Sequence, residues 1–572
     1  MSNSRFVAGI SMATLVAILG PSHVGAQGIA PPGEAAVASR MEAFGASVPG
    51  SIMALQPWRN AQEAMAADGT TYRLTSLNPY VNSWFVLDVD TPDGRRVSYH
   101  LENADPETWQ VALMEEDGAP AMRVEDAETG DVILCSPWRG ELAEARATDL
   151  PYAPICDWSL FLRNPVNGNR TTREAVSDFL RENVVFGDSI VNLIKGAFYE
   201  DAFMVSSEEL DIADEEEVSG VDLLGNALLD RAPVMRPYMG FDLIGAEAGM
   251  QAGSWYEVEG APGIFASVMQ PGMIARSLFD VPGANWLDGV ENSADVYLVA
   301  FDMSRFDIGY ELGTDHPNLG WSSRPSHRHR APGPDGFARP DPLVLNGTLN
   351  PELVEDVAAA FTGGFKRDHG AWRFGDYATF NWGNHYGFMQ DGVMLSRLWP
   401  NLATLYFTTD GEVRMETWTE EHMDLLPNVV MARQNGVPLI EDGVPGSRVT
   451  SWGGGNWSGS AEANLRTLRA GACMRTVEGR PFLIYAYFSS ATPSGMARTF
   501  QAYQCDYAML LDMNSQELTY MALYQHDGEA LEAQHLVQGM AEVDVRGSRG
   551  TRIPRFVSAP DNRDFFYLVR RD

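Results

Sequence analysis

Cysteine, positive charge and long apolar runs are all scarce in this sequence. Only four of the 572 residues are cysteine, and none forms a Cys-x-x-Cys pair or a Cys/His cluster with metal-ligand spacing. This scarcity argues against a zinc site built on thiolates. After residue 26 no apolar run approaches the roughly 20 residues that a membrane-spanning helix needs. We therefore expect a soluble mature chain with no stable membrane insertion.

The shortage of positive charge narrows the partners further. Lysine and arginine total 41 against 77 aspartates and glutamates, which leaves a formal net charge of −36. Nucleic-acid binding depends on lysine and arginine neutralising phosphates, so this balance argues against nucleic acid as a partner. It also disfavours simple adhesion to an anionic membrane. A hydrophobic content of 45% indicates a globular protein, and the length predicts two or three domains.

The first 26 residues have the order of a secretion signal. Arg5 precedes the apolar run Phe6–Leu19, and the small residues Val24-Gly25-Ala26 stand before Gln27. A basic, then apolar, then A-x-A-like order is typical of a cleavable signal peptide. The alternative is a buried N-terminal helix. We predict a periplasmic or secreted protein.

The four cysteines allow three pairings. Their neighbourhood in the sequence favours Cys135 with Cys156 and Cys473 with Cys505, since each pair closes a modest loop. An exported protein meets conditions that permit both disulfides. The alternative is four free buried thiols.

The mature chain divides by pattern into four segments. Residues 27–70 are rich in alanine and proline, whereas residues 71–165 alternate short apolar runs with turns such as Asp117-Gly118, which predicts an antiparallel β domain. Residues 166–250 contain apolar positions at helical spacing and the acidic run Glu208–Glu217, which predicts a helical connector with an acidic linker. In residues 251–572 strand and helix patterns alternate, so we predict an α+β fold whose C-terminal domain contains a mixed sheet.

Two motifs suggest where chemistry takes place. Gly363 and Gly364 let the backbone approach a ligand closely and present successive N–H groups to an anion, although a plain glycine turn is the alternative. Asp512 ends an apolar strand that follows a helical segment, and strand ends of this kind open onto ligand crevices. Its carboxylate could serve as a base, or it could merely cap a turn. Asp391-Gly392 and Asp410-Gly411 are first of all hairpin turns.

Histidines offer a third, weaker possibility. His327 and His329 form a His-x-His in a basic, proline-rich stretch, and with His369 they could hold a metal. No further ligand is obvious in the sequence. A flexible surface loop is the preferred interpretation, and we expect no metal and no cofactor.

Taken in order, several segments between about Trp255 and Arg571 resemble the phosphodiester glycosidase family. The similar segments are Phe361-Thr362-Gly363-Gly364-Phe365 with His369, Tyr386–Gly392, Ala403–Trp418, Ala432–Asn435, Arg469-Ala470-Gly471 and Ala508–Asp512. The resemblance implies an exported hydrolase that cleaves a sugar 1-phosphodiester, with a sugar phosphodiester or glycan as its substrate. It does not extend to residues 27–250.

The resemblance also implies roles for individual residues. Asp512, Arg469 and His369 become the catalytic candidates, with Arg469 as a phosphate clamp. The candidates for substrate binding are Thr362, Gly363, Gly364, Arg433 and Asn514.

Two positions depart from the family pattern. Thr362 replaces the usual asparagine of the glycine motif, and Met513-Asn514 replace two glycines after the last strand. These departures support an alternative function, a non-catalytic envelope protein that binds a glycan or a protein partner.

Overall fold

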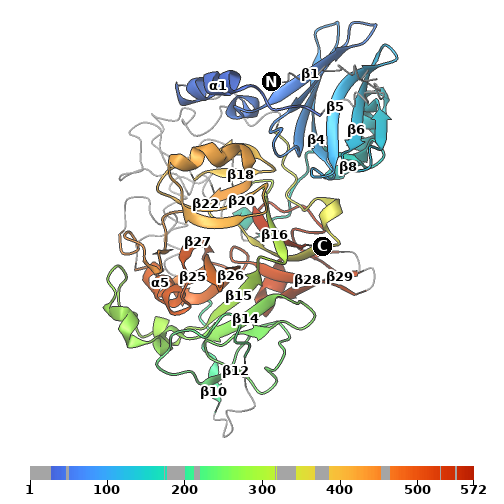
Figure 1. The fold of residues 1–572 in the computed structure, drawn as a ribbon. Helices are drawn as coiled ribbons and strands as arrows, with labels where there is room; N and C mark the ends of the chain where they lie inside the picture. The colour runs from blue at the N-terminus through green and yellow to red at the C-terminus, as the bar shows by residue number, and fades with distance from the viewer. Residues whose placement is uncertain are drawn as a thin grey trace, which may run out of the picture.

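The protein is mostly β-structure in two parts. The computed structural model describes residues 28–46, 51–172, 174–176, 200–210, 220–315, 317, 343–366, 386–451, 464–527, 530–547 and 551–571. Their strands form seven sheets. An N-terminal β unit stands at the upper end of the molecule, and a larger C-terminal body lies below it, with the C-terminus near the boundary (Figure 1).

Two antiparallel sheets make up the N-terminal unit. One has the order β1-β2-β3-β4-β9-β8 and the other β5-β6-β7. Their bounds are β1 Asn60–Met65, β2 Thr71–Ser76, β3 Trp84–Asp90, β4 Arg96–Asn103, β5 Trp109–Glu116, β6 Ala119–Asp126, β7 Val132–Cys135, β8 Tyr152–Ile155 and β9 Leu160–Arg163. Helix α1 (Glu34–Ala46) precedes the unit, η1 (Ile52–Leu55) leads into it, and η2 (Pro137–Arg139) and α2 (Glu141–Ala147) lie between β7 and β8.

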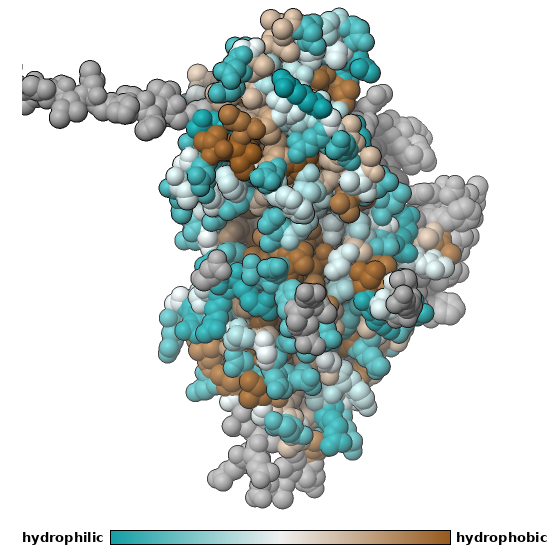
Figure 2. Space-filling view, turned by 90° about the vertical axis from the view of Figure 1, so that its right-hand side faces the viewer, coloured by the Kyte–Doolittle hydropathy of each residue, from teal (hydrophilic) through white to brown (hydrophobic). Residues whose placement is uncertain are grey.

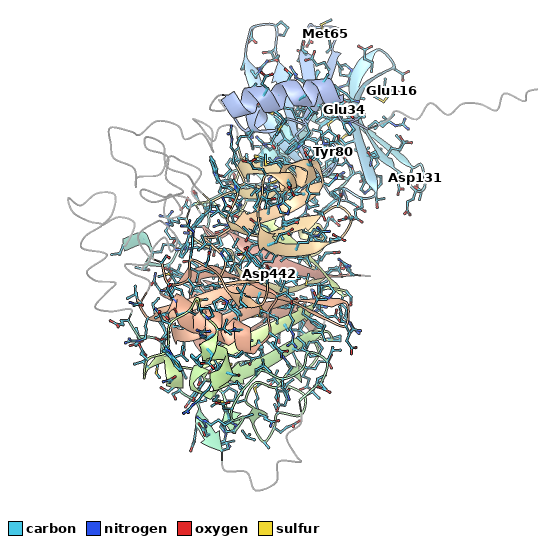
Figure 3. The ribbon with its side chains drawn as sticks, turned by 60° about the vertical axis from the view of Figure 1, so that its left-hand side comes forward. Glu34, Met65, Tyr80, Glu116, Asp131 and Asp442 are labelled. Atoms are coloured by element: carbon cyan, nitrogen blue, oxygen red, sulfur yellow. A yellow bond between two sulfur atoms is a disulfide. The ribbon has the colours of Figure 1, made fainter. Side chains whose placement is uncertain are left out.

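Local turn chemistry explains the hairpins of this unit. Asp117 and Gly118 join β5 to β6 with φ values of 51° and 76°. Positive φ at both central residues is the type I′ conformation, whose twist matches that of the flanking strands. Figure 3 shows Met65, Glu116 and Asp131 at the outer ends of these hairpins, far from Asp442 in the body.

Three large sheets build the C-terminal body. Their orders are β13-β14-β15-β26-β25-β27-β23-β24, β16-β32-β17-β28-β29 and β19-β18-β22-β20-β21. The first contains β13 Tyr256–Glu257, β14 Ile264–Met269, β15 Val296–Asp302, β23 Ile440–Glu441, β24 Val444–Pro445, β25 Thr467–Val477, β26 Arg480–Ala491 and β27 Tyr507–Met513. The second contains β16 Phe306–Glu311, β17 Val357–Thr362, β28 Met521–Asp527, β29 Ala530–His535 and β32 Phe565–Arg570. The third contains β18 Phe388–Gln390, β19 Val393–Ser396, β20 Ala403–Thr408, β21 Val413–Thr417 and β22 Val429–Gln434.

Short elements complete the body. Two small sheets join β10 Glu208–Leu210, β11 Val234–Arg236 and β12 Met250–Gln251, and β30 Val545–Arg546 with β31 Arg552–Ile553. The 3-10 helices among its described residues are η4 Pro271–Met273, η5 Arg276–Asp280, η6 Glu291–Ser293, η8 Pro351–Leu353, η9 Glu421–Asn428 and η10 Gln538–Val543.

Strand β26 shows how the body buries its largest sheet. Leu483, Tyr485 and Tyr487 face one hydrophobic core, whereas the alternating residues Ile484 and Ala486 face another. Successive strand residues point to opposite faces, so a sheet covered on both sides needs a continuous apolar run. The sequence PFLIYAYF supplies that run.

Helix α5 (Pro493–Ala502) covers one face of this sheet. Thr492 caps it by accepting a hydrogen bond from the Gly495 N–H, and Pro493 occupies its first turn. The helix is buried all round. It approaches β25 so closely that a Cβ on Gly471 would lie 2.8 Å from Met496 Cε and 3.0 Å from Phe500 Cζ. Only glycine fits at this contact.

The predicted α+β fold with a mixed sheet is wrong. Every strand pair in the three large sheets of the body is antiparallel. The pattern β26-α5-β27 suggested a parallel pair joined by a helical crossover. In the structure β25 lies between these two strands and pairs antiparallel with both.

The predicted helical connector is also not what the structure contains. The described residues 200–210 and 220–250 hold three short strands and irregular backbone. Residues 172 and 174–176 are helical, but residues 177–199 and 211–219, which carry most of the predicted helix and of the acidic run, lie outside the described residues.

Both predicted disulfide pairings are present. Cys135 is bonded to Cys156 in the N-terminal unit, and Cys473 is bonded to Cys505 beside α5. Disulfides persist in oxidising compartments, so the two bonds fit a secreted or periplasmic protein. The predicted signal peptide lies outside the described residues. No helix among the described residues has the length and apolar character to cross a membrane.

Hydrophilic and hydrophobic side chains are mixed on the surface (Figure 2). Figure 2 shows the side of the molecule that carries the N-terminal unit, with hydrophobic side chains in separate patches interrupted by hydrophilic ones.

Candidate functional site

Asp512 lies where β27 is irregular. Strand β25 pairs Arg469 with Met513 but Gly471 with Leu510, so β27 carries one extra residue over this stretch. Such a bulge bends a strand and redirects its side chains, and bulges are common next to active sites. Asp512 is buried, with 5% of its surface exposed, and its Oδ1 accepts a hydrogen bond from the Met513 N–H at 2.8 Å.

Arg563 joins Asp512 to a second carboxylate. Its Nη1 donates to Asp512 Oδ2 at 3.1 Å, and its Nη2 donates to Glu174 Oε1 at 2.7 Å. Burial by itself lowers the pKa of Arg563, but the carboxylates of Glu174 and Asp512 outweigh it and raise that pKa. The guanidinium is therefore a permanent cation that holds two carboxylates near each other.

The third guanidinium nitrogen of Arg563, Nε, takes no part in these two hydrogen bonds. It is buried, and no described residue accepts a hydrogen bond from it. Buried donors are nearly always paired, with protein, water or a ligand, so an unpaired one calls for an explanation. Lys366 adds a second cation nearby, with its Nζ 3.8 Å from Glu174 Oε1.

Arg433 and Asp564 form a second ion pair in the same region. Arg433 Nε donates to Asp564 Oδ2 at 3.0 Å, and the hydroxyl of Tyr310 donates to the same oxygen at 3.0 Å. Burial raises the pKa of Asp564, and the attraction of Arg433 opposes that rise. Arg433 also donates to the backbone oxygens of Phe365 and Gln434. These three hydrogen bonds all have acceptors within the protein.

The glycine turn packs against this pair. The Gly363 N–H donates to the backbone oxygen of Asp564 at 2.9 Å. A Cβ on Gly363 would lie 2.3 Å from Asp564 Oδ2. Gly364 has φ = +155°, and a Cβ there would lie 2.9 Å from Asn435 Cγ. Close packing, therefore, already requires both glycines.

Asn435 ties the turn to β27. Its Oδ1 accepts from the Phe365 N–H at 3.2 Å, and its Nδ2 donates to the backbone oxygens of Leu510 and Leu511 at 2.6 and 2.8 Å. The ends of β17, β22 and β27 and the start of β32 thus meet at one place. We call Asp512, Arg563, Glu174, Arg433 and Asp564 the Asp512 site.

Three other predicted site residues make hydrogen bonds with partners inside the protein. The hydroxyl of Thr362 donates to the Leu518 oxygen at 2.7 Å. Arg469 is fully buried, and it donates to the backbone oxygens of Ala491 and Leu465 at 2.8 and 2.9 Å. Burial lowers the pKa of Arg469 to about 10, with Glu291 acting in the opposite sense. Asn514 has a left-handed backbone, φ = 84°, and its side-chain oxygen accepts from Thr467 at 3.3 Å.

The structure therefore brings Asp512, Arg433, Gly363 and Gly364 together, while Arg469 contacts Met513, the residue after Asp512. His369, His327 and His329 lie outside the described residues. Among the residues that the structure does describe, no group of histidine, cysteine, aspartate and glutamate side chains could hold a metal ion.

Sequence reasoning missed Glu174, Arg563, Asp564 and Asn435. Glu174 had a signal: Thr171-x-x-Glu174 is a capping-box pattern, and the Thr171 hydroxyl accepts from the Glu174 N–H at 3.2 Å. That pattern indicates where a helix begins. It says nothing of a partner hundreds of residues away.

A second buried arginine joins the two parts of the chain. Arg163 of β9 bonds Glu102 of β4, Glu311 of β16 at 3.3 Å and Asp391 of the β18–β19 turn at 3.4 Å. Its Nε donates to Asn346 at 3.1 Å, and its guanidinium lies 4.0 Å from the Trp84 ring centroid. Burial raises the pKa of Glu102 to about 7, although Arg163 attracts the ionised form. We call Arg163, Glu102, Glu311 and Asp391 the Arg163 cluster.

Comparison with known proteins adds little to this geometry. No protein-family model matches the chain, and no curated protein matches it. Among solved structures, the chain is similar to the crystal structure of a "putative exported protein" from Burkholderia pseudomallei K96243, at 10% identity and a TM-score of 0.21, over 91% of this chain and 99% of that one. A TM-score this low does not establish a shared fold, so it carries no argument.

Proposed function

We propose that the protein is an exported hydrolase that cleaves a sugar 1-phosphodiester at the Asp512 site. The bond broken joins the anomeric carbon of the sugar to the phosphate oxygen. The resemblance of the segments around Gly363, Arg469 and Asp512 to the phosphodiester glycosidases supports this assignment. Export through a signal peptide at residues 1–26 is part of the same proposal.

The observation that carries the proposal is the bonding of Arg563. Two of its nitrogens hold carboxylates, and its buried Nε has no partner among the described residues. A phosphate oxygen could accept from that Nε, since guanidinium N–H groups match oxyanions well. In this proposal Arg563, with Lys366 beside Glu174, contacts the phosphate. That is the role the sequence assigned to Arg469, whose bonds run to backbone oxygens.

The chemistry asks little of the protein, because a phosphate monoester is a good leaving group. Water adds its oxygen to the anomeric carbon while the carbon–oxygen bond to phosphate breaks, and the electron pair of that bond leaves with the phosphate. The proton lost by water passes to the Asp512 carboxylate and then to solvent. Asp512 also opposes the positive charge that develops on the sugar ring in the transition state. His369 remains a predicted acid or phosphate contact.

The net charge of −36 does not forbid an anionic substrate. At an ionic strength near 0.15 M, exposed charges are screened beyond about 8 Å. The Asp512 site contains two cations bonded to its carboxylates, Arg563 and Arg433, and Lys366 lies beside it, 3.8 Å from Glu174. Remote acidic residues slow association in low salt more than they weaken binding.

The test uses purified mature protein and UDP-N-acetylglucosamine, with a methyl-phosphate diester of the same sugar as a second substrate. Release of free sugar is followed for the wild type, Asp512→Asn and Asp442→Asn. Asp442 lies exposed in the β23–β24 turn with φ = 52°, which asparagine tolerates, so its substitution is a matched control. We expect Asp512→Asn to lower kcat/KM about 1,000-fold or more, as loss of a catalytic carboxylate does, and Asp442→Asn to act as wild type. Equal rates for the two variants would refute the role of Asp512.

A second candidate function has its own support. Several donors that were predicted to bind the substrate make hydrogen bonds within the protein instead. They belong to Thr362, Gly363, Arg433 and Arg469. This favours an envelope protein that binds a glycan or protein partner without turnover. Absence of hydrolysis by the wild type on both substrates, together with retained glycan binding, would select it.

A further inference from the structure

Trp286 is exposed in an unusual way. Its side chain is 70% exposed, although its ring stacks on Phe279 with centroids 4.9 Å apart and planes 12° from parallel. One face of the indole is therefore covered by Phe279, and the opposite face is turned to solvent. Trp286 lies in the loop between η5 and η6.

The buried Arg498 of α5 holds this loop in place. Arg498 of α5 is 1% exposed, and it donates to the backbone oxygens of Leu278, Val281 and Ala284 at 2.7, 2.8 and 2.8 Å. Its guanidinium also lies 5.3 Å from the centroid of Phe279. Arg498, Phe279 and Trp286 thus form a layered stack that rises from α5 to the surface. Segment η5 lies beside α5 at the edge of the body (Figure 1).

The far end of the loop is anchored as well. The Asn285 N–H donates to Ser494 Oγ at 3.0 Å, and Asp288 accepts from Arg466 at 2.7 Å. Arg466 directly precedes β25, which lies next to β27, the strand that contains Asp512. A platform held at both ends loses little conformational entropy when it binds a ligand.

The surroundings of the platform are polar. Arg276, Ser277, Asp280 and Asn285 are exposed around it. A stable protein interface buries about 800 Å² on each partner and needs a contiguous centre, which a single ring pair in a polar rim does not supply. A pyranose ring with equatorial hydroxyls fits better, because its C–H groups form a flat apolar face and its hydroxyls reach the rim.

We propose that Trp286, stacked on Phe279, is a binding platform for the pyranose rings of a neutral oligosaccharide with equatorial hydroxyls. The charges around the platform are mixed, since Arg276 and Asp280 are both exposed and Asp288 pairs with Arg466, so no excess of one sign is present to attract a charged glycan. The platform works outside the Asp512 site, and its binding does not depend on hydrolysis there. It would hold a glycan next to the end of the sheet that carries Asp512.

Trp158 offers a matched control. It is 60% exposed, but it meets Phe161 edge to face at 6.3 Å and 90°, and no ring among the residues that the structure describes stacks on it. Its substitution removes a similar exposed surface from the N-terminal unit. It leaves the stack on Arg498 untouched.

The experiment is calorimetric titration of the full mature protein with chitohexaose and with cellohexaose. We expect the wild type to bind at least one of them, Trp286→Ala to weaken it tenfold or more, and Trp286→Tyr to retain most of the affinity, because an aromatic face is kept. Trp158→Ala should bind as wild type. Neither oligosaccharide contains a phosphodiester, so this titration tests the platform separately from the proposed hydrolysis.

Three results would overturn the platform. One is no binding of either sugar by the wild type at concentrations up to about 5 mM, beyond the weak range of specific binding. Another is equal affinity of Trp286→Ala and wild type. The third is a concentration-dependent dimer in sedimentation that Trp286→Ala abolishes while no sugar binds, since the ring would then serve a protein contact.

Discussion

The Arg163 cluster and the Asp512 site are both built on a buried arginine bonded to carboxylates, yet their bonding differs. In the Arg163 cluster, every guanidinium nitrogen donates to a described side chain, and three carboxylates surround one cation. In the Asp512 site, Arg563 holds two carboxylates and keeps its Nε unpaired among the described residues. An arginine whose nitrogens all donate to protein side chains can only hold parts of the chain together. An arginine with an unused N–H donor can still bind a ligand.

Their positions sharpen the contrast. The Arg163 cluster joins strands of the N-terminal unit to β16 and the β18–β19 turn of the body. The Asp512 site lies where strands of the three large sheets of the body end. We therefore assign stability to the first and chemistry to the second.

The largest expected effect is the loss of stability in Arg163→Met. The substitution leaves the buried carboxylates of Glu102 and Glu311 and the partly buried carboxylate of Asp391 without their cation. Breaking a buried ion pair on one side costs about 3–5 kcal/mol, and urea unfolding measures this loss. The control is Arg96→Met on the same unit, whose side chain is 64% exposed and pairs with Asp90, for which we expect about 0–1 kcal/mol. Equal losses of unfolding free energy in Arg163→Met and Arg96→Met would contradict a structural role for the Arg163 cluster.

The second effect separates the two arginines by activity. Arg563→Lys keeps a positive charge but loses the planar fork that binds Asp512 and Glu174 and that, in the proposed function, also contacts the phosphate. We expect kcat/KM on the sugar diester to fall about 100-fold, or about 2.7 kcal/mol. Arg163→Lys should lose stability but, at a temperature where it remains folded, retain kcat/KM within about threefold. The reverse pattern would exchange the roles of the two regions.

The smallest effect is the pH dependence of the Arg163 cluster. Burial raises the pKa of Glu102 to about 7, so the folded state holds a proton that the unfolded chain releases above its ordinary pKa near 4.5. The stabilisation from this group is complete below that ordinary pKa and is lost as the pH rises through 7. We expect the free energy of unfolding to fall by about 2 kcal/mol between pH 5 and pH 8.

Burial raises the pKa of Glu311 in the same sense, so it adds to this slope. Tyr152, Tyr567, His100 and Asp391 are the other titratable groups around the cluster. Because Glu311 keeps its own contribution, Glu102→Gln should make the pH profile of urea unfolding less steep without abolishing its slope. Glu63→Gln, whose side chain is 58% exposed, should leave the profile unchanged. If the pH profile of Glu102→Gln is as steep as that of the wild type, the proton taken up on folding is bound by a group other than Glu102.

The sequence predicted what short-range chemistry decides. Each disulfide joins cysteines 21 or 32 residues apart, and both pairings were predicted from that closeness. The hairpin at Asp117-Gly118 was read from its turn residues. Asp391-Gly392 was read in the same way, with φ values of 51° and 73°. The structure adds that the Asp391 carboxylate reaches Arg163, 228 residues away in the chain, which turn chemistry does not reveal.

The topology of the body was predicted wrongly for a physical reason. A strand, a helix and a strand in succession fit a parallel pair and equally fit two strands separated by a third. The choice rests on β25, which enters between β26 and β27 from earlier in the chain. The spacing of apolar residues indicates that a strand is buried, but it does not indicate which other strand pairs with it.

By itself the sequence determined the strands, the tight turns, the local disulfides and the acidic surface, because residues a few positions apart control backbone angles and charge. It also marked Asp512 and the Gly363-Gly364 turn as places of interest. Only the tertiary structure decided that Arg563 links Asp512 to Glu174, and that Arg163 gathers Glu102, Glu311 and Asp391. These partners lie up to 389 residues apart. A buried charge is stable only beside its counter-charge, and that pairing exists only once the sheets have packed.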